Sequence, residues 1–146
     1  TKTGVGAIVA VFLVLLGLVL AALELASLRL TVAIGLVVAA EVGAKLGMAT
    51  VACVGTASHE GLGSALTESA EPALLVGPLL AALPALLLAP LAAGIAAVAA
   101  GPLLGLWLVR WADEALGGVN GDIFGATNEL ARMVGLHAGV ILWTLW

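Results

Sequence analysis

The residues most able to do chemistry lie in one stretch, GGVNGDIFGATNE, at residues 117–129. Asp122 and Glu129 are seven residues apart, so on an α-helix their side chains point within about 20° of each other. Asn120 is a favourable N-cap for such a helix, and the helix start offers free N–H groups to an anion. Two acids beside glycines and a helix N-terminus suit Mg²⁺ and phosphate together.

The spacing also limits what these two carboxylates can do alone. Seven residues separate their Cα atoms by about 10.5 Å along a helix axis, whereas paired metal ions sit about 4 Å apart. We therefore expect Asp122 and Glu129 to need further carboxylates from elsewhere to complete an ion site.

A purely structural interpretation accounts for the same residues. Asp122 would then be a helix-start acid that complements the helix dipole, and Glu129 would pair with Arg132 at i+3. Gly121 and Gly125 would form a GxxxG face for helix packing. The residues alone leave both interpretations open.

Other polar residues are weaker candidates. Glu41 and Lys45 fall inside an apolar segment and can pair at i,i+4. Intramembrane charges of this kind are either functional or a structural ion pair. Lys45 could contact a substrate phosphate if its end of the helix lines a cavity.

The two histidines are also weak candidates. His59 does not begin an HExxH zinc motif, because position 63 is glycine, and we expect it to be a loop residue that a substrate could contact. His137 is expected to be a hydrogen-bonded packing residue.

Composition restricts the class of protein. The chain has 146 residues, of which 63% are hydrophobic and 10% charged, whereas soluble domains carry about a quarter charged residues. The formal net charge of −4 gives no basic footprint for nucleic acid. No P-loop, dinucleotide fingerprint, zinc-ligand spacing or serine elbow is present, and the single Cys53 cannot form an internal disulfide. We conclude that the chain is an integral membrane protein.

The apolar runs predict an all-α polytopic bundle of about five spanning helices, in a single domain over residues 1–146. The predicted spans are residues 5–23, 30–54, two helices within 73–109, and 121–146. The third run carries no charge and is too long for one helix, so we place a turn near residues 89–94, where Pro90 and Gly94 stand.

The polar segments between the spans, residues 55–72 and 110–122, fall on one side of the membrane in this topology. That side also holds most of the basic residues, which are Lys2, Lys45, Arg110 and Arg132, while Arg29 lies on the other side. Because cytoplasmic loops carry the excess of Lys and Arg, we expect both polar segments to face the cytoplasm. The chain begins Thr-Lys-Thr-Gly, without methionine, so we also expect it to be a portion of a longer protein.

The glycine-acid stretch resembles the C-terminal signature of the cobalamin synthase family, whose members are membrane-integral adenosylcobinamide-GDP ribazoletransferases. The family pattern is Gly-Gly-x-Thr-Gly-Asp, two variable residues, Gly-Ala, two variable residues and Glu; here Asn120 replaces the usual Thr or Ser. HEGLGSALTE at residues 59–68 is similar to the family's Gly-Leu-Gly loop, and KTGVGA at residues 2–7 to a glycine-rich start of its central span. The many Ala and Val residues and the short acidic loops are typical of a halophilic archaeal member.

This resemblance implies a transferase of cobalamin biosynthesis at the cell membrane. A hydroxyl of α-ribazole, or of its 5′-phosphate, would attack adenosylcobinamide-GDP and release GMP, with Mg²⁺ as the cofactor. The resemblance implies Asp122 and Glu129 as catalytic residues and metal ligands. The predicted substrate-binding residues are Gly117, Gly118, Asn120, Gly121, Lys45 and His59.

Members of that family are longer, and their upstream Asp-Gly-x-x-Asp type motif has no counterpart here, so we expect this chain alone to form an incomplete active site. Association with an upstream part, or with a second copy of the chain, stays open. The alternative is a small non-enzymatic membrane protein, such as a transporter subunit or an assembly factor. A transporter would place its charges near the membrane midplane, whereas the candidate residues here gather at one end of the bundle.

Overall fold

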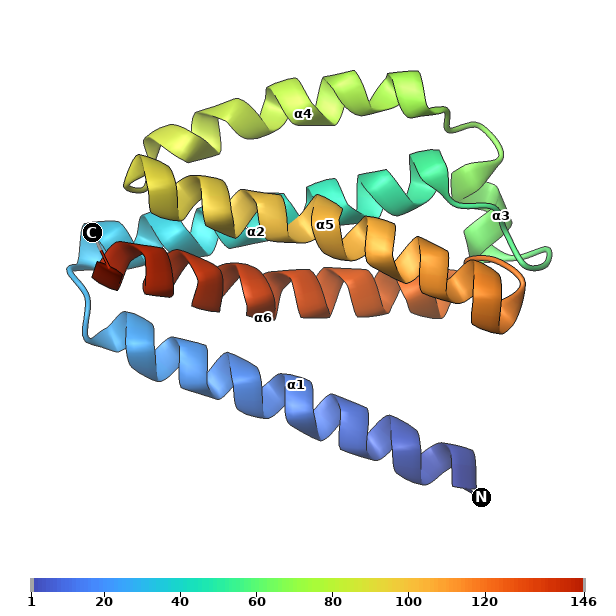
Figure 1. The fold of residues 1–146 in the computed structure, drawn as a ribbon, viewed down its shortest axis with the longest axis horizontal. Helices are drawn as coiled ribbons and strands as arrows, with labels where there is room; N and C mark the ends of the chain where they lie inside the picture. The colour runs from blue at the N-terminus through green and yellow to red at the C-terminus, as the bar shows by residue number, and fades with distance from the viewer. Residues whose placement is uncertain (1, 146) are drawn as a thin grey trace.

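Helices account for nearly the whole chain in the computed structural model, which describes the backbone of residues 2–145 and the side chains of residues 4–145 (Figure 1). The long helices are α1 (Lys2–Ala26), α2 (Leu30–Val54), α5 (Leu91–Leu116) and α6 (Gly121–Leu145). The shorter elements are α3 (Leu62–Thr67), η1 (Pro72–Leu75), α4 (Val76–Ala82) and η2 (Leu83–Leu87). The all-α prediction is confirmed. The side chain of Lys2, which the predicted topology places on the cytoplasmic side, lies outside the described side chains.

Helices α2, α5 and α6 pack together as the core of the bundle, and small residues let α2 and α5 touch along their backbones. A Cβ atom at Gly105 would lie 2.7 Å from the carbonyl oxygen of Gly47, and a Cβ atom at Gly47 would lie 2.7 Å from the carbonyl oxygen of Gly101. Contacts this short leave no room for a side chain. The two helices therefore cross at a glycine seam, in which Gly43 and Gly47 face Gly101 and Gly105, and such close packing is what associates helices in lipid.

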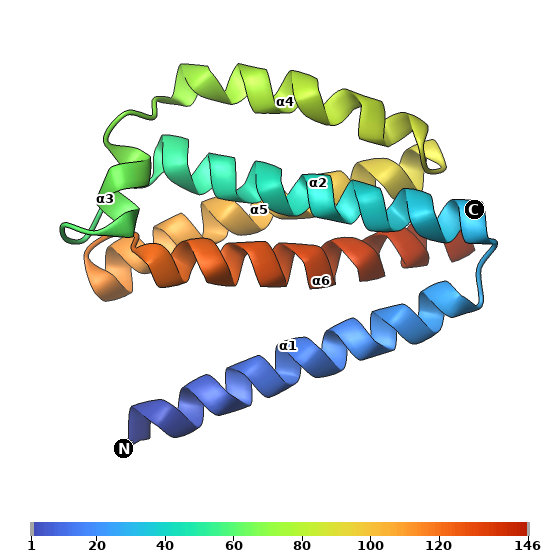
Figure 2. The ribbon, with the colours of Figure 1, turned by 180° about the vertical axis from the view of Figure 1, so that it is seen from behind.

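Helix α1 lies apart from this core and diverges from α6 toward its own N-terminus (Figures 1 and 2). Apart from Ala21, its described residues are exposed or half-buried. It is fastened in its C-terminal half, where Met133 of α6 packs over Gly17, and His137 of α6 contacts Gly17 and Glu24. As a result, α1 and α6 form a wedge that widens toward the start of α1.

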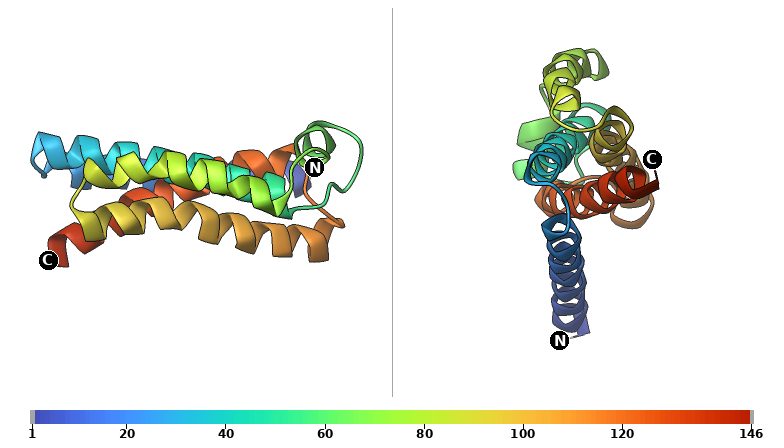
Figure 3. Two further views of the ribbon diagram at one scale, coloured as in Figure 1. Left: turned by 90° about the horizontal axis from the view of Figure 1, so that it is seen from above. Right: turned by 90° about the vertical axis from the view of Figure 1, so that its left-hand side faces the viewer.

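A second layer on the other side of the core is formed by η1, α4 and η2, which follow one another as a rod over residues 72–87 (Figures 1 and 3). The rod packs mainly on α2. The chain reverses at residues 88–90, and Pro90 is the N-cap of α5. The turn predicted near residues 89–94 therefore exists, but it lies slightly earlier in the chain.

Within the described residues, three helices are long and apolar enough to cross a membrane, namely Gly4–Ala26, Leu30–Val54 and Leu91–Leu116. This supports the membrane class but does not confirm five spans. The rod is a shorter apolar element, because residues 72–87 are fewer than the roughly 20 residues that a spanning helix needs. Helix α6 has the length to span, but Asn128, Glu129, Arg132 and His137 lower its hydropathy.

Candidate active site

Two polar connections meet at one end of the bundle, where the segment after α2 contacts the turn between α5 and α6. Ala57 and Val119 form an isolated parallel β-bridge. The Ser58 N–H donates to the Val119 carbonyl oxygen at 3.0 Å, and the Val119 N–H donates to the Thr56 carbonyl oxygen at 2.7 Å. The two polar segments are therefore in contact at one end of the bundle, as a shared side of the membrane requires, while the side that they face stays a prediction.

Gly117 and Gly118 make this meeting possible. Gly117 ends α5 with a φ of 73°, in the left-handed region that glycine adopts most easily. Gly118 has a φ of 137°, and a Cβ atom there would lie 2.8 Å from the backbone nitrogen of Ser58. Gly118 is buried while Gly117 is exposed, so of this pair only Gly117 is open to a ligand.

Asn120 caps the start of α6, as its place in the sequence predicts. Its Oδ1 atom accepts hydrogen bonds from the backbone N–H groups of Asp122 at 3.0 Å and Ile123 at 3.2 Å. An amide oxygen thus performs the capping that a Thr or Ser hydroxyl would perform here. The cap places Asp122 in the first turn of α6, at the positive end of the helix dipole.

Helix α3 packs over the same turn. Gly63 is buried against it, because a Cβ atom there would lie 2.9 Å from the Asn120 Cα atom. Leu62 covers Gly121, with side-chain atoms 3.4–4.0 Å from the position of a Cβ atom at that glycine. The two stretches that carry the family resemblance, residues 59–68 and 117–129, are therefore in direct contact.

A cavity of about 750 Å³ opens between α1 and α6, and both predicted carboxylates, Asp122 and Glu129, line it. The remaining lining residues are Gly121, Gly125, Ala126, Leu130 and Met133 of α6, and Ala10, Val11, Leu13, Val14 and Leu15 of α1. No atom lies within 4 Å of a Cβ atom placed at Gly125. Gly125 therefore borders this cavity instead of packing against a helix as the GxxxG alternative predicts, whereas Gly121 lines the cavity and also packs against Leu62 of α3.

The two carboxylates differ in their surroundings. Asp122 is exposed, and among residues 4–145 its carboxylate makes no hydrogen bond or ion pair. Both oxygens of Glu129 are engaged: Oε1 accepts from Asn128 Nδ2 at 2.8 Å, and Oε2 accepts from Arg132 Nη1 at 2.6 Å. Glu129 thus lines the cavity and also forms the i+3 ion pair that the structural interpretation predicts.

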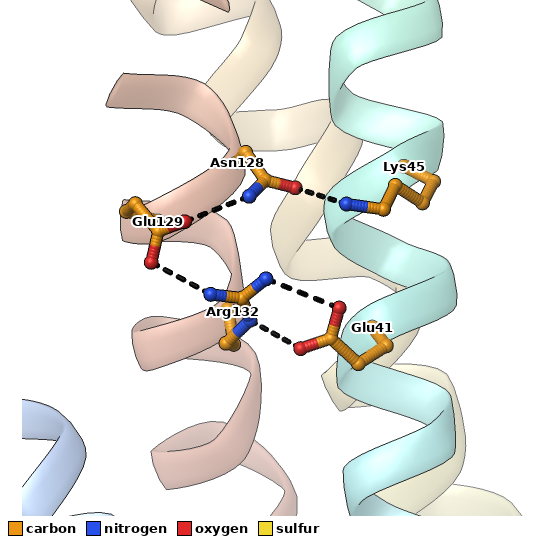
Figure 4. A network of polar contacts seen from close by, with 5 residues as sticks. All are labelled: Glu41, Lys45, Asn128, Glu129 and Arg132. Atoms are coloured by element: carbon orange, nitrogen blue, oxygen red, sulfur yellow. Dashed lines mark hydrogen bonds and ion pairs between the residues drawn. The ribbon is translucent and has the colours of Figure 1, made fainter. Parts of the chain in front are cut away.

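Figure 4 shows that Glu129 belongs to a polar network between α2 and α6. Arg132 donates to Glu41 of α2 through Nε, and through Nη2 at 3.3 Å. Lys45 of α2 donates to Asn128 Oδ1 at 2.6 Å. In the part of the chain that the structure describes, Glu41 and Lys45 do not form the i,i+4 pair that their spacing suggests, because each reaches across to α6 instead.

The sequence interpretation misses two parts of this network. Asn128 carries no motif, and its signal in the sequence is a polar side chain beside Glu129 in a helix long enough to span a membrane. Arg132 and Glu41 are 91 residues apart, so only the packing of α2 against α6 brings them together.

Of the six predicted substrate-binding residues, Gly121 alone lines the α1–α6 cavity. Gly117, Gly118 and Asn120 lie in the turn before α6, and Lys45 and His59 lie elsewhere. Lys45 lines a second cavity of about 440 Å³ between α2 and α4, together with Glu41. His59 is exposed in the loop before α3, with its Nδ1 atom 2.8 Å from the Ser58 hydroxyl. The structure therefore brings Lys45 next to Asn128 but leaves His59 at the loop surface.

The described part of the chain contains no group of three or more His, Cys, Asp or Glu side chains that could hold a metal ion. Mg²⁺ is commonly bound through one or two carboxylates together with substrate phosphates and water. Asp122 and Glu129, on one wall of one cavity, fit that mode of binding but not a dedicated cage.

Comparison with known proteins agrees with the sequence pattern. Residues 1–140 match the family described as cobalamin-5-phosphate synthase. The chain is 52% identical to the adenosylcobinamide-GDP ribazoletransferase of Halobacterium salinarum, over 99% of this chain and 73% of the relative. Proteins of that name from Halorubrum lacusprofundi and Haloquadratum walsbyi are 48% and 43% identical, and the match covers 97% and 99% of this chain but only 59% and 58% of theirs. No solved structure matches the chain.

Proposed function

The chain belongs to the cobalamin-5-phosphate synthase family, and from this premise we propose that it carries part of the active site of an adenosylcobinamide-GDP ribazoletransferase. The family and its halophilic archaeal type are those that the sequence predicts, which argues against the non-enzymatic alternative. One observation carries the proposal. The two acids of the family signature, Asp122 and Glu129, line one cavity at the end where the two polar connections meet.

The proposed reaction is a substitution at phosphorus. A hydroxyl oxygen of α-ribazole, or of its 5′-phosphate, forms a bond to the phosphorus that carries the cobinamide, and that hydroxyl loses its proton. The bond from this phosphorus to the bridging oxygen breaks, and the oxygen leaves with GMP. A bound Mg²⁺ would neutralise charge on the diphosphate as the bridge breaks.

The residues of this chain would divide the work between holding the ion and holding the phosphates. Asp122, which has no partner among the described side chains, is the proposed metal ligand, and Glu129 is a second ligand or an orienting group. The absence of side chains at Gly117 and Gly121 would let a phosphate approach the backbone. Gly118 is buried and would stabilise the turn through its packing against residues 56–58. The proposed polar contacts to the substrates come from the amide of Asn120, from Lys45 and from His59.

The proposed topology has five passes through the cell membrane, with the rod over residues 72–87 and α6 as passes besides the three apolar helices. The chain order in Figure 1 supports it, since α1 starts, α2 ends and α5 ends at the same end of the bundle as α3. Arg110 near the end of α5 lies toward that end, and Arg29 lies at the opposite end. Arg110 fits a site that faces the cytoplasm, whereas Arg29 is the exception to the excess of basic residues on that side.

The test is an in vitro transfer assay with the full-length protein, in which GMP release is measured with and without Mg²⁺. We expect Asp122→Ala to lower the rate by at least about 100-fold while the protein still inserts, because the ion would lose its proposed ligand. Asp113→Ala is the matched control, since it removes an exposed carboxylate of α5 at the same end of the bundle. Near-normal turnover by Asp122→Ala would remove the proposed site.

A further inference from the structure

Arg132 divides its positive charge between two carboxylates on different helices. Its Nε and Nη2 atoms donate to Glu41 of α2, while its Nη1 atom donates to Glu129 at 2.6 Å. A guanidinium that offers two donors to one carboxylate has its plane fixed, so the direction of its remaining donors is fixed as well. The contact with Glu41 therefore sets where the guanidinium meets Glu129.

Arg132, Glu41 and Glu129 together carry a net charge of −1, and the ammonium group of Lys45 brings the five-residue network to zero. Two carboxylates share one guanidinium, while Lys45 directs its ammonium group to the amide oxygen of Asn128. The side chains of Arg132, Glu41 and Glu129 are 25%, 39% and 44% exposed, so water screens their charges only in part. Removing one of these charges is therefore expected to matter more than it would at a fully exposed ion pair.

We propose that Glu41 is a positioning residue for Glu129 and acts through Arg132. Its carboxylate occupies the guanidinium, so that Glu129 keeps part of its negative charge for a divalent cation in the cavity between α1 and α6. Without the charge of Glu41, Arg132 and Glu129 form a closed, neutral pair that attracts a cation less. This inference rests on the proposed function, which places such a cation beside Asp122 and Glu129.

Binding of Mn²⁺ alone to the full-length enzyme tests the proposal, with the loss of the free-ion signal measured by electron paramagnetic resonance. Glu41→Gln keeps the shape of the side chain and a hydrogen-bond acceptor but removes the charge. We expect it to raise the Kd for Mn²⁺ about tenfold, equivalent to about 1.4 kcal/mol, and to lower kcat while KM for α-ribazole is unchanged. Glu41→Asp restores the charge and should bring the Kd back to within about threefold of the wild-type value.

The matched control is Glu114→Gln, which removes a carboxylate from an ion pair on the surface of α5. Glu114 lies 3.8 Å from Arg110 and its side chain is 74% exposed. Among the described residues no hydrogen bond or ion pair joins this pair to the network, and water screens it, so we expect the Kd for Mn²⁺ and the kcat to stay at their wild-type values.

Asp122→Asn separates failure of this inference from failure of the proposed function. If Asp122→Asn loses Mn²⁺ binding and Glu41→Gln retains it, the positioning role of Glu41 is wrong and the proposed function stands. If Asp122→Asn binds Mn²⁺ like the wild type, both are wrong. A defect in Glu41→Gln that Glu41→Asp does not correct would indicate a contact that serves only stability, and it would also overturn the inference.

Discussion

His137 of α6 places its Nδ1 atom 3.0 Å from a carboxylate oxygen of Glu24, near the end of α1. Its Nε2 atom lies 3.0 Å from the carbonyl oxygen of Gly17, which can only accept a hydrogen bond. Nε2 can therefore donate to this oxygen, while Nδ1 faces the carboxylate of Glu24. His137 is thus a hydrogen-bonded packing residue, as the sequence predicts, and it joins α1 to the core.

We expect His137→Ala to loosen α1 from α6, at a cost of about 1 kcal/mol in stability, because two hydrogen bonds are lost. Spin labels at Ile8 and Val134, in a Cys53→Ser background, report the distance between these helices. The distribution of that distance should broaden in the variant. Thr144→Ala removes a hydroxyl elsewhere on α6 and should leave it unchanged. An unaltered distribution in His137→Ala would show that apolar packing alone holds α1.

Gly125→Leu should block the cavity without destabilising the fold. No atom lies within 4 Å of a Cβ atom at Gly125, and leucine also has the better helix propensity. We expect GMP release to fall at least about tenfold, since the side chain would fill the space between Asp122 and Glu129, while the thermal unfolding midpoint does not decrease. Gly77→Leu on α4 makes the same change at another open glycine and should leave the rate unaltered. Full activity of Gly125→Leu would show that substrate does not use this cavity.

Substitutions of Asn120 should distinguish capping from other roles. Asn120→Thr keeps an oxygen that can accept from the N–H groups of Asp122 and Ile123, whereas Asn120→Ala removes it. We expect Asn120→Ala to cost about 1 kcal/mol and to speed hydrogen exchange of those two amides, with Asn120→Thr close to the wild type. If both variants exchange equally fast, capping by this side chain contributes nothing measurable to the start of α6.

Gly101→Ala should strongly destabilise the bundle. A methyl group there would overlap the backbone of Gly43 in the glycine seam, so the two helices would have to separate along their crossing. We expect the unfolding free energy to fall by about 3 kcal/mol or more, measured by thermal unfolding in detergent. Gly94→Ala is the control on the same helix, because the nearest atom would lie 3.4 Å away, at an ordinary contact distance. Equal stability of the two variants would contradict the close crossing.

The sequence predicts interactions between residues that are close along the chain, and it does not predict contacts between distant helices. The cap at Asn120 and the common face of Asp122 and Glu129 depend on neighbours within two helical turns, so residue spacing is sufficient to predict them. The contact between Glu41 and Arg132 depends on how two helices rotate about their axes, and spacing alone points to the wrong partner for Glu41.

The number of membrane-spanning helices also cannot be predicted from the hydropathy of the sequence alone. Residues 72–87 are apolar, but they fold as two 3₁₀ segments, which hold Pro72 and Pro84, and one short α-helix. Helix α6 shows the opposite behaviour, since it is long and regular although its sequence is interrupted by charge. Arg132 is accommodated because Glu41 of α2 supplies its partner, and Lys45 of α2 contacts Asn128.

The bridge between Ala57 and Val119 is made by main-chain groups, so it tolerates substitutions in the loop. A bond between a backbone N–H and a carbonyl oxygen does not depend on which side chain the residue bears. The loop at residues 56–58 can therefore change its amino acids over generations while it continues to hold the turn before α6 in place. Proline at position 58 is the exception, since it lacks the N–H that reaches Val119.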